Sequence, residues 1–261
     1  MKDSSNLLEM RNISKEFPGV KALDNVTLKV KKGSVHALMG ENGAGKSTLM
    51  KCLFGIYHPN SGEIFISGQK VQFKNSKHAL DNGVSMVHQE LNQVRERNVM
   101  DNLFLGRYPV NSAGIVDEGR MKKEASELFR KLGMTVNLTQ PMRNMSVSQR
   151  QMCEIAKAIS YNAKVIVLDE PTSSLDDEEV EKLFVLMRRL REEGVGIIFV
   201  THFLEQVYAV CDRITVLRNG HFVGEYKTEE LPRFKLVATM MGKEFDDLAD
   251  IKGSGTSSKK Q

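Results

Sequence analysis

The chain has 261 residues, of which 41% are hydrophobic and 27% charged, a composition typical of a globular protein with a buried core. Its 37 basic and 33 acidic residues leave a net charge of +4, too small to indicate a nucleic-acid-binding protein without a concentrated basic stripe. No such stripe dominates, and the longest apolar runs are far shorter than the roughly 18 residues that a membrane-spanning helix needs.

The ends and the cysteines indicate where the protein works. The first ten residues, MKDSSNLLEM, lack the charged and then apolar pattern of a secretory signal. Cys52, Cys153 and Cys211 are odd in number and include no CxxC pair. We therefore expect a reducing, cytoplasmic setting, with neither structural disulfides nor a zinc site.

The first third of the chain predicts strands, a loop and a helix. Alternating apolar residues across 7–30, interrupted by the turn at Pro18 and Gly19, predict an antiparallel pair of strands. The apolar run 35–39 predicts a buried strand, which a glycine-rich loop separates from a helix at 46–54. Two short strands within 63–73, a helix and a strand at 84–88 follow.

The rest of the chain is first helical and then alternating. Segments 121–132 and 148–159 predict helices, and we interpret about 90–160 as a helical subdomain inserted in a domain that spans 1–245. A strand at 164–168, a helix from Asp177, a strand at 196–201, a helix and two strands around 218–220 follow. This order predicts an α/β fold with a mainly parallel sheet. Residues 246–261, rich in glycine, serine and lysine, predict a disordered tail or a truncated linker.

A glycine-rich loop carries the strongest functional signal. Residues 40–48, GENGAGKST, fit G-x-x-x-x-G-K-[ST] between a strand and a helix, the context in which this pattern binds nucleotide phosphates. Glycines let backbone N–H groups curl around phosphates, Lys46 reaches the outer phosphates, and Ser47 offers a hydroxyl to Mg²⁺. A structural turn before a buried helix is the alternative, and it leaves the Lys-Ser pair unexplained. The predicted phosphate-binding residues are Gly40, Glu41, Asn42, Gly43, Ala44, Gly45, Lys46, Ser47 and Thr48.

Two carboxylates follow the apolar strand VIVL at 165–168. Open α/β sheets place their ligands at the carboxyl ends of strands, where Asp169 and Glu170 emerge. Together with the phosphate loop, this predicts Asp169 in the Mg²⁺ shell and Glu170 as the base that orients an attacking water.

The order of these motifs resembles the ATP-binding subunits of ABC transporters, from Leu7 to about Phe245. The resemblance also rests on Gln89 in MVHQEL, MSVSQRQ at 145–151, SSLD at 173–176 and His202 in FVTH. It implies that Phe17 stacks on adenine, that Gln89 reaches both Mg²⁺ and the attacking water, and that His202 contacts the γ-phosphate.

The resemblance further implies a signature loop that faces the ATP held by a second ATPase half. The family pattern L-S-G-G-Q is replaced here by Met145, Ser146, Val147, Ser148 and Gln149. Because glycines permit close backbone approach, the Cβ atoms of Val147 and Ser148 are expected to weaken the site that this loop completes.

Within the family, the chain resembles the ATP-binding proteins of importers of simple sugars in the segments FPGVKALDNV, NLFLGRYP and EIAKAISYNAK. The resemblance is stronger to importers of galactose and methyl galactoside than to importers of ribose or nucleosides. Such proteins usually carry two ATPase halves in a chain about twice as long, so this chain resembles the amino-terminal half. The resemblance implies an ATP hydrolase with ATP and Mg²⁺ as cofactors. Its implied partners are a second ATPase half, in the same chain or as a homodimer, and transmembrane permease subunits at the cytoplasmic face of the membrane. An external sugar-binding protein acts indirectly, and no nucleic acid is involved.

Two other functions stay open at this point. One is a soluble ABC-type ATPase that acts on nucleic acid or ribosomes, which would not sediment with a permease. The other is a non-catalytic nucleotide-binding module, which would bind ATP without turnover in every pairing.

Overall fold

The computed structural model describes residues 6–88 and 91–242. The strands of this part form one ten-stranded sheet in the order β5-β4-β1-β2-β10-β9-β3-β8-β7-β6. The strands are β1 (Asn6–Phe17), β2 (Val20–Lys31), β3 (Val35–Met39), β4 (Ser61–Ile66), β5 (Gln69–Val71), β6 (Val84–Val87), β7 (Val165–Asp169), β8 (Gly196–Val200), β9 (Arg213–Arg218) and β10 (His221–Lys227). The helices are α1 (Lys46–Leu53), α2 (Ser76–Asp81), α3 (Val99–Leu103), α4 (Glu118–Lys131), α5 (Val147–Ile159), α6 (Asp177–Glu192), α7 (Leu204–Val210) and α8 (Arg233–Met241), with short 3-10 turns at Met142–Asn144 and Thr228–Glu230.

The sheet has a parallel part and an antiparallel part. Strands β9, β3, β8, β7 and β6 run parallel to one another, whereas β5, β4, β1 and β2 form antiparallel pairs and β10 pairs antiparallel with β9. A single parallel pair, His221 with Asp24, joins the two parts through β10 and β2. The predicted antiparallel opening strands and the predicted parallel sheet are both confirmed, and so is the α/β class.

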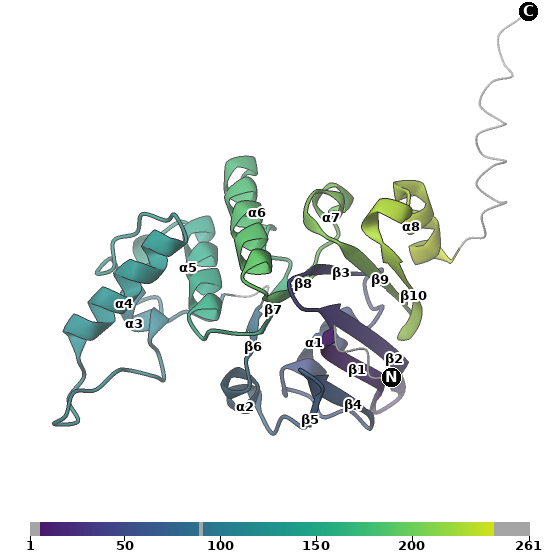
Figure 1. The fold of residues 1–261 in the computed structure, drawn as a ribbon, viewed down its shortest axis with the longest axis horizontal. Helices are drawn as coiled ribbons and strands as arrows, with labels where there is room; N and C mark the ends of the chain where they lie inside the picture. The colour runs from purple at the N-terminus through teal and green to yellow at the C-terminus, as the bar shows by residue number, and fades with distance from the viewer. Residues whose placement is uncertain (1–5, 89–90, 243–261) are drawn as a thin grey trace, which may run out of the picture.

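The central strands are buried on both faces, because helices cover each side. Figure 1 shows α5, α6, α7 and α8 on one side of these strands, with α1 on the other side, towards β1 and β2. Along β7, Val165 and Val167 belong to the apolar cluster that includes α1, whereas Ile166 and Leu168 belong to the cluster that includes α6. This explains why the central strands are continuous apolar runs rather than alternating ones.

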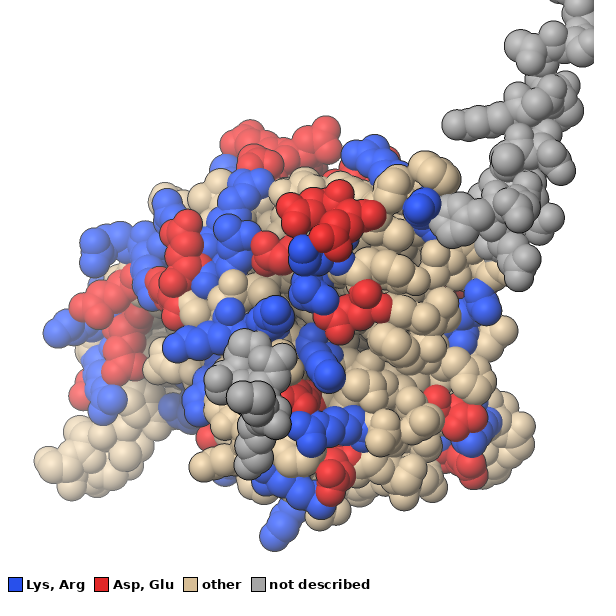
Figure 2. Space-filling model, turned by 45° about the vertical axis from the view of Figure 1, so that its right-hand side comes forward, with Lys and Arg blue, Asp and Glu red and all other residues tan. Residues whose placement is uncertain are grey.

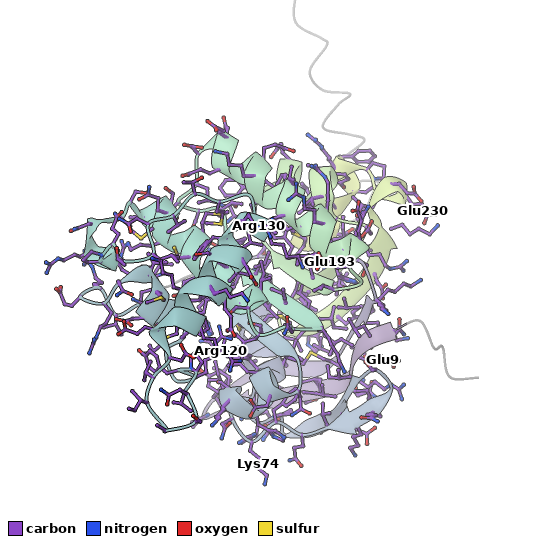
Figure 3. All side chains as sticks on the ribbon, turned by 60° about the vertical axis from the view of Figure 1, so that its left-hand side comes forward. Glu9, Lys74, Arg120, Arg130, Glu193 and Glu230 are labelled. Carbon is purple, nitrogen blue, oxygen red and sulfur yellow. The ribbon has the colours of Figure 1, made fainter. Side chains whose placement is uncertain are left out.

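The segment between β6 and β7 is helical and has an apolar cluster of its own. Met121 and Phe129 of α4 pack there against α3 and α5. Lys131 Nζ, at the end of α4, lies 2.9 Å from Glu193 Oε1, just after α6. In Figure 3, Arg130 and Glu193 mark these two helix ends. Helices predicted at 121–132 and 148–159 therefore correspond to α4 and α5.

Helix α6 follows from its sequence in detail. Asp176 caps its first turn in a capping box with Glu179, and Leu183 and Met187 of the predicted apolar stripe are fully buried. Gly194, with φ +89°, ends the turn that follows. Phe17 is the last residue of β1, where it pairs with Val20 of β2.

Candidate functional site

The loop between β3 and α1 borders a cavity of about 520 Å³. Two of its glycines are required by close contacts as well as by backbone angles. Gly45 has φ +100°, and a Cβ there would lie 2.9 Å from Ala22 O. Gly40 has φ +152°, and a Cβ there would collide with the backbone oxygen of Leu217. The loop therefore packs closely between β2 and the end of β9.

The side chain of Lys46 is held inside this loop. Its Nζ donates to Gly40 O at 2.8 Å and to Glu41 O at 3.0 Å. Burial lowers the pKa of Lys46, while the charges of Glu170 and Asp169 act in the opposite direction. The ammonium group is thus partly dehydrated, and an anion in the cavity would interact with it more strongly than in bulk water.

Asp169, at the end of β7, and Ser47, at the start of α1, line the same cavity. Burial and the neighbouring charge of Glu170 raise the pKa of Asp169, and Lys46 partly offsets this. A cation at this position would relieve both unfavourable effects. A hydroxyl and a carboxylate are oxygen ligands of the kind that Mg²⁺ prefers, so this donor set fits the predicted ion.

Glu170 and His202 lie side by side after β7 and β8. His202 Nδ1 is 3.4 Å from Glu170 Oε1, and the Glu170 N–H donates to Val200 O at 2.9 Å. Glu170 has φ +47°, a left-handed conformation that is unfavourable for a residue with a Cβ. The ring of His202 packs on Phe203, with centroids 4.1 Å apart, and its side chain is 61% exposed.

Most of the predicted phosphate and metal residues are brought together at the cavity. Its lining includes, among the predicted residues, Asn42, Gly43, Ala44, Gly45, Lys46, Ser47, Thr48, Asp169 and Glu170. Gly40 and Glu41 contribute through their carbonyl contacts to Lys46. Gln89 lies outside the described residues, and its role stays a prediction.

Phe17 and the signature residues lie apart from this lining. Phe17 meets the ring of Tyr57 edge-on at 5.1 Å, and Lys15 Nζ lies 5.2 Å from the centre of the Phe17 ring. Val20, its strand partner, does line the cavity. The signature residues form the amino-terminal turn of α5: Ser146, Val147, Ser148 and Gln149.

Sequence reasoning missed a second wall of the cavity, formed by β2 and the β9–β10 turn. The Gly220 N–H donates to Ala44 O at 3.1 Å, and the Asp24 N–H donates to Gly220 O at 2.8 Å. The Asn-Gly turn was a visible sequence signal for a hairpin, but nothing in the sequence placed it beside the phosphate loop. The lining residues that were missed are Val20, Lys21, Ala22, Val200, Asn219 and Gly220.

Residues 6–88 and 91–242 contain no group of three or more His, Cys, Asp or Glu side chains placed to hold a metal ion. In the same residues, every helix is too short or too polar to cross a membrane.

A sequence profile of the ABC transporter family matches residues 23–173. The galactose/methyl galactoside import ATP-binding protein MglA of Clostridium perfringens is 65% identical over 247 residues, which cover 95% of this chain and 48% of that protein. The protein of the same name from Fusobacterium nucleatum is 52% identical over 95% of this chain and 49% of its own length. The chain thus spans about half the length of the curated relatives it matches.

Solved structures show the same fold. The crystal structure of a nucleotide-free ATP-binding cassette from an ABC transporter aligns with a TM-score of 0.78 at 24% identity, over 95% of this chain and 98% of that chain. The dimeric structure of MJ0796, a bacterial ABC transporter cassette, aligns with a TM-score of 0.74 at 25% identity, over 85% of this chain and 98% of that chain. With a profile match over more than half of its residues and relatives this similar, the chain belongs to the ABC transporter family.

Proposed function

We propose that this chain binds Mg·ATP and hydrolyses it, as one of two paired ATPase halves that power the import of a simple sugar. The observation that carries the proposal is one cavity with four groups on its walls: the Lys46 ammonium, the Ser47 hydroxyl and the carboxylates of Asp169 and Glu170. A phosphate chain needs cationic and N–H groups, and its hydrolysis needs a carboxylate beside them.

Each residue of the site has a distinct task in this proposal. The loop N–H groups and the start of α1 bind the phosphates, and Lys46 neutralises their charge. Ser47 and Asp169, with Gln89, would hold Mg²⁺, which supplies charge neutralisation between the phosphates. Glu170 orients the attacking water, and His202 contacts both Glu170 and the γ-phosphate. Catalysis is then positioning and electrostatic stabilisation, without a covalent intermediate on the protein.

Phe17 completes the nucleotide site by stacking on adenine. Because Val20, its partner across the β1–β2 turn, lines the cavity, a base that extends past Val20 would reach the Phe17 ring. Phe17 is 36% exposed, so part of its surface is accessible to a ligand.

Sugar import is inferred from the relatives. The proteins from Clostridium perfringens and Fusobacterium nucleatum are named as galactose/methyl galactoside import ATP-binding proteins. We infer the same substrate class for the transporter that this chain serves, in preference to ribose or nucleosides. The chain itself need not contact the sugar, because it works at the cytoplasmic face of the membrane on permease subunits. The dimeric structure of the similar bacterial cassette supports pairing with a second half.

Lys46→Ala tests the nucleotide site. We expect this variant to lose most of its affinity for a fluorescent ATP analogue while its melting temperature stays unchanged, since Lys46 contacts loop carbonyls and is not a core residue. Lys122→Ala, at an exposed position of α4, is the matched control and should bind like the wild type. Unchanged affinity in a folded Lys46→Ala variant would contradict the site.

The transport step needs a separate test. Uptake of labelled galactose should depend on Lys46 when this chain is present in its full-length protein together with the permease. Uptake of ribose in place of galactose would contradict the proposed sugar but would not bear on the proposed ATP site.

A further inference from the structure

Gln206, on α7, links the two loops that carry Glu170 and His202. Its side-chain oxygen Oε1 accepts one hydrogen bond from Thr172 Oγ1 at 2.8 Å and another from Thr201 Oγ1 at 3.3 Å. Thr172 lies two residues after Glu170, and Thr201 directly precedes His202. One side-chain amide, near the start of α7, therefore ties the loop after β7 to the loop after β8.

Both threonine hydroxyls are withdrawn from solvent, since Thr172 is 5% and Thr201 3% exposed. A buried hydroxyl that loses its hydrogen-bond partner destabilises the fold, so burial favours the hydrogen bonds from these two hydroxyls to the Gln206 oxygen. Thr201 Oγ1 also accepts the Phe203 N–H at 3.2 Å, which fixes the start of α7 relative to His202. Both hydroxyls of the link are therefore buried and hydrogen-bonded.

A second link lies on the strand side of the same two loops. There the Glu170 N–H donates to Val200 O at 2.9 Å, while Asp169 and Val200 pair in the sheet. Glu170 and His202 thus lie between a backbone link and the Gln206 link, with Oε1 and Nδ1 3.4 Å apart. Because Glu170 has φ +47°, its loop would relax towards a more favourable conformation if one link were removed.

We propose that Gln206 is a positioning residue for ATP hydrolysis, which sets the separation of Glu170 and His202. The proposal rests on the proposed function, in which these two side chains orient the attacking water and contact the γ-phosphate. Among the described residues, those that line the cavity do not include Gln206, Thr172 or Thr201. Removing the link should therefore change the rate of hydrolysis and leave ATP binding intact.

Gln206→Leu removes the acceptor and keeps the size of the side chain. A small displacement of catalytic groups can cost up to about a hundredfold in rate, so we expect kcat to fall by about tenfold or more. The Kd for Mg·ATP should change by less than about twofold, because ground-state binding is untouched. Single-turnover hydrolysis of radiolabelled ATP by the full chain measures the rate, with Glu170→Gln as the reference for lost hydrolysis.

Two further variants separate positioning from simple destabilisation. Gln206→Glu keeps an oxygen that accepts from both hydroxyls and should return kcat to within about threefold of the wild type. Glu205→Ala changes the preceding residue, whose contact is Arg233 at 3.6 Å, and should leave kcat unchanged. In NMR spectra, Gln206→Leu should shift the ring signals of His202 but not those of His58, and Gln206→Glu should shift neither.

The outcomes decide the proposal and the function separately. A folded Gln206→Leu variant with wild-type kcat and an unshifted His202 signal would overturn the positioning role, while lost ATP binding in Lys46→Ala would still support the proposed function. If Gln206→Leu does not fold, Thr172→Val and Thr201→Val remove the two donors one at a time, with the same expected loss of kcat. If the wild-type chain shows no turnover, the His202 signals alone decide.

Discussion

At the scale of single residues, burial shifts the pKa values of several side chains in the candidate site and in the core. Burial lowers the pKa of Lys46 and raises that of Asp169, which means that it disfavours the charged form of each group. A ligand with negative phosphates would stabilise the charged Lys46, and an accompanying cation would stabilise the charged Asp169. Burial also raises the pKa of the Cys52 thiol to about 11 and of the Cys153 thiol to about 12, which keeps both thiols protonated and unreactive. The same effect acts on a histidine outside the site.

His36 is fully buried on β3, and its Nε2 is 2.7 Å from Thr215 Oγ1. Its Nδ1 has no hydrogen-bond partner among the residues that the structure describes. Burial, reinforced by the charge of Arg213, lowers the pKa of His36 to about 3. The folded protein therefore holds this ring neutral at pH values where an unfolded chain, with a histidine pKa of about 6.5, protonates it.

The resulting pH dependence is our first prediction for stability. Between pH 6.5 and 3 the unfolded state binds the extra proton, so the free energy of unfolding falls as the pH falls. Between pH 7 and pH 5 this group should remove roughly 2 kcal/mol of stability. Urea unfolding at the two pH values measures the loss. The double variant His36→Leu with Thr215→Val removes both members of the hydrogen-bonded pair, so its unfolding free energy should fall by roughly 2 kcal/mol less between the two pH values. If the double variant loses as much stability as the wild type, His36 is not the source of the pH dependence.

At the scale of elements, α5 explains how this chain can depart from the family signature and still form its helix. Ser146 caps α5 through the Gln149 N–H at 3.1 Å, and Gln149 Oε1 accepts the Ser146 N–H at 3.0 Å. Val147 and Ser148 occupy the first turn, where ordinary residues form helix better than glycine does. Val147 and Ser148 in place of two glycines therefore stabilise the helix locally, while their Cβ atoms hinder close approach of this backbone to a phosphate bound by the partner half.

Ser146→Ala tests the two roles of this helix end. Loss of the cap should lower the free energy of unfolding by about 1 kcal/mol. ATP binding at this chain's own cavity should not change, because Ser146 is not among the residues that line it, whereas turnover at the partner's site should fall. Chemical denaturation and fluorescent nucleotide titration measure the first two effects. Ser126→Ala, in the middle of α4, is the control; a loss of binding at the chain's own cavity would contradict the assignment of Ser146 to the partner.

At the scale of the whole molecule, the cavity that Lys46 and Asp169 line lies where the two parts of the sheet meet. Strand β2 supplies Val20 to Ala22, the parallel part supplies α1 and the end of β7, and the β9–β10 turn closes the junction. In Figure 2, positive and negative side chains are interspersed over one face of the molecule. The mixed charges on this face agree with the small net charge of the sequence.

The incomplete signature predicts how the chain behaves alone. A pair of identical chains would present Val147 and Ser148 to both ATP molecules. Lost charge-assisted hydrogen bonds to the γ-phosphate cost about 1.5–3 kcal/mol each, or on the order of ten- to a hundredfold in rate. We expect the 261-residue chain to bind ATP, to remain largely monomeric and to hydrolyse slowly. Turnover should rise sharply with a partner half that carries L-S-G-G-Q and with a permease.

Steady-state ATPase assays and sedimentation of the purified chain check this expectation. The control is the same assay on Glu170→Gln, which sets the background. If the chain alone turns over ATP as fast as the complete transporter, the altered signature is no handicap and the half-site argument is wrong.

The secondary-structure elements, and the chemistry that depends on local residue order, can be predicted from the sequence alone. The phosphate loop, the acids after β7 and the capped stripe of α6 are each readable within one segment, because glycine conformation, helix caps and apolar periodicity are local properties. Strand positions were predicted to within a few residues for the same reason. The family resemblance added roles for Phe17, Gln89 and His202 that no local pattern carries.

Which distant segments share the cavity depends on how the strands assemble into the sheet. The turn at Asn219 and Gly220 lies beside Ala44 because β10 joins β2, a pairing of strands far apart in the chain. The link from Gln206 to Thr172 and Thr201 likewise depends on β7 and β8 being neighbours. Neither contact has a sequence signal, since a hydrogen bond between remote residues depends on the global sheet order and not on local propensity.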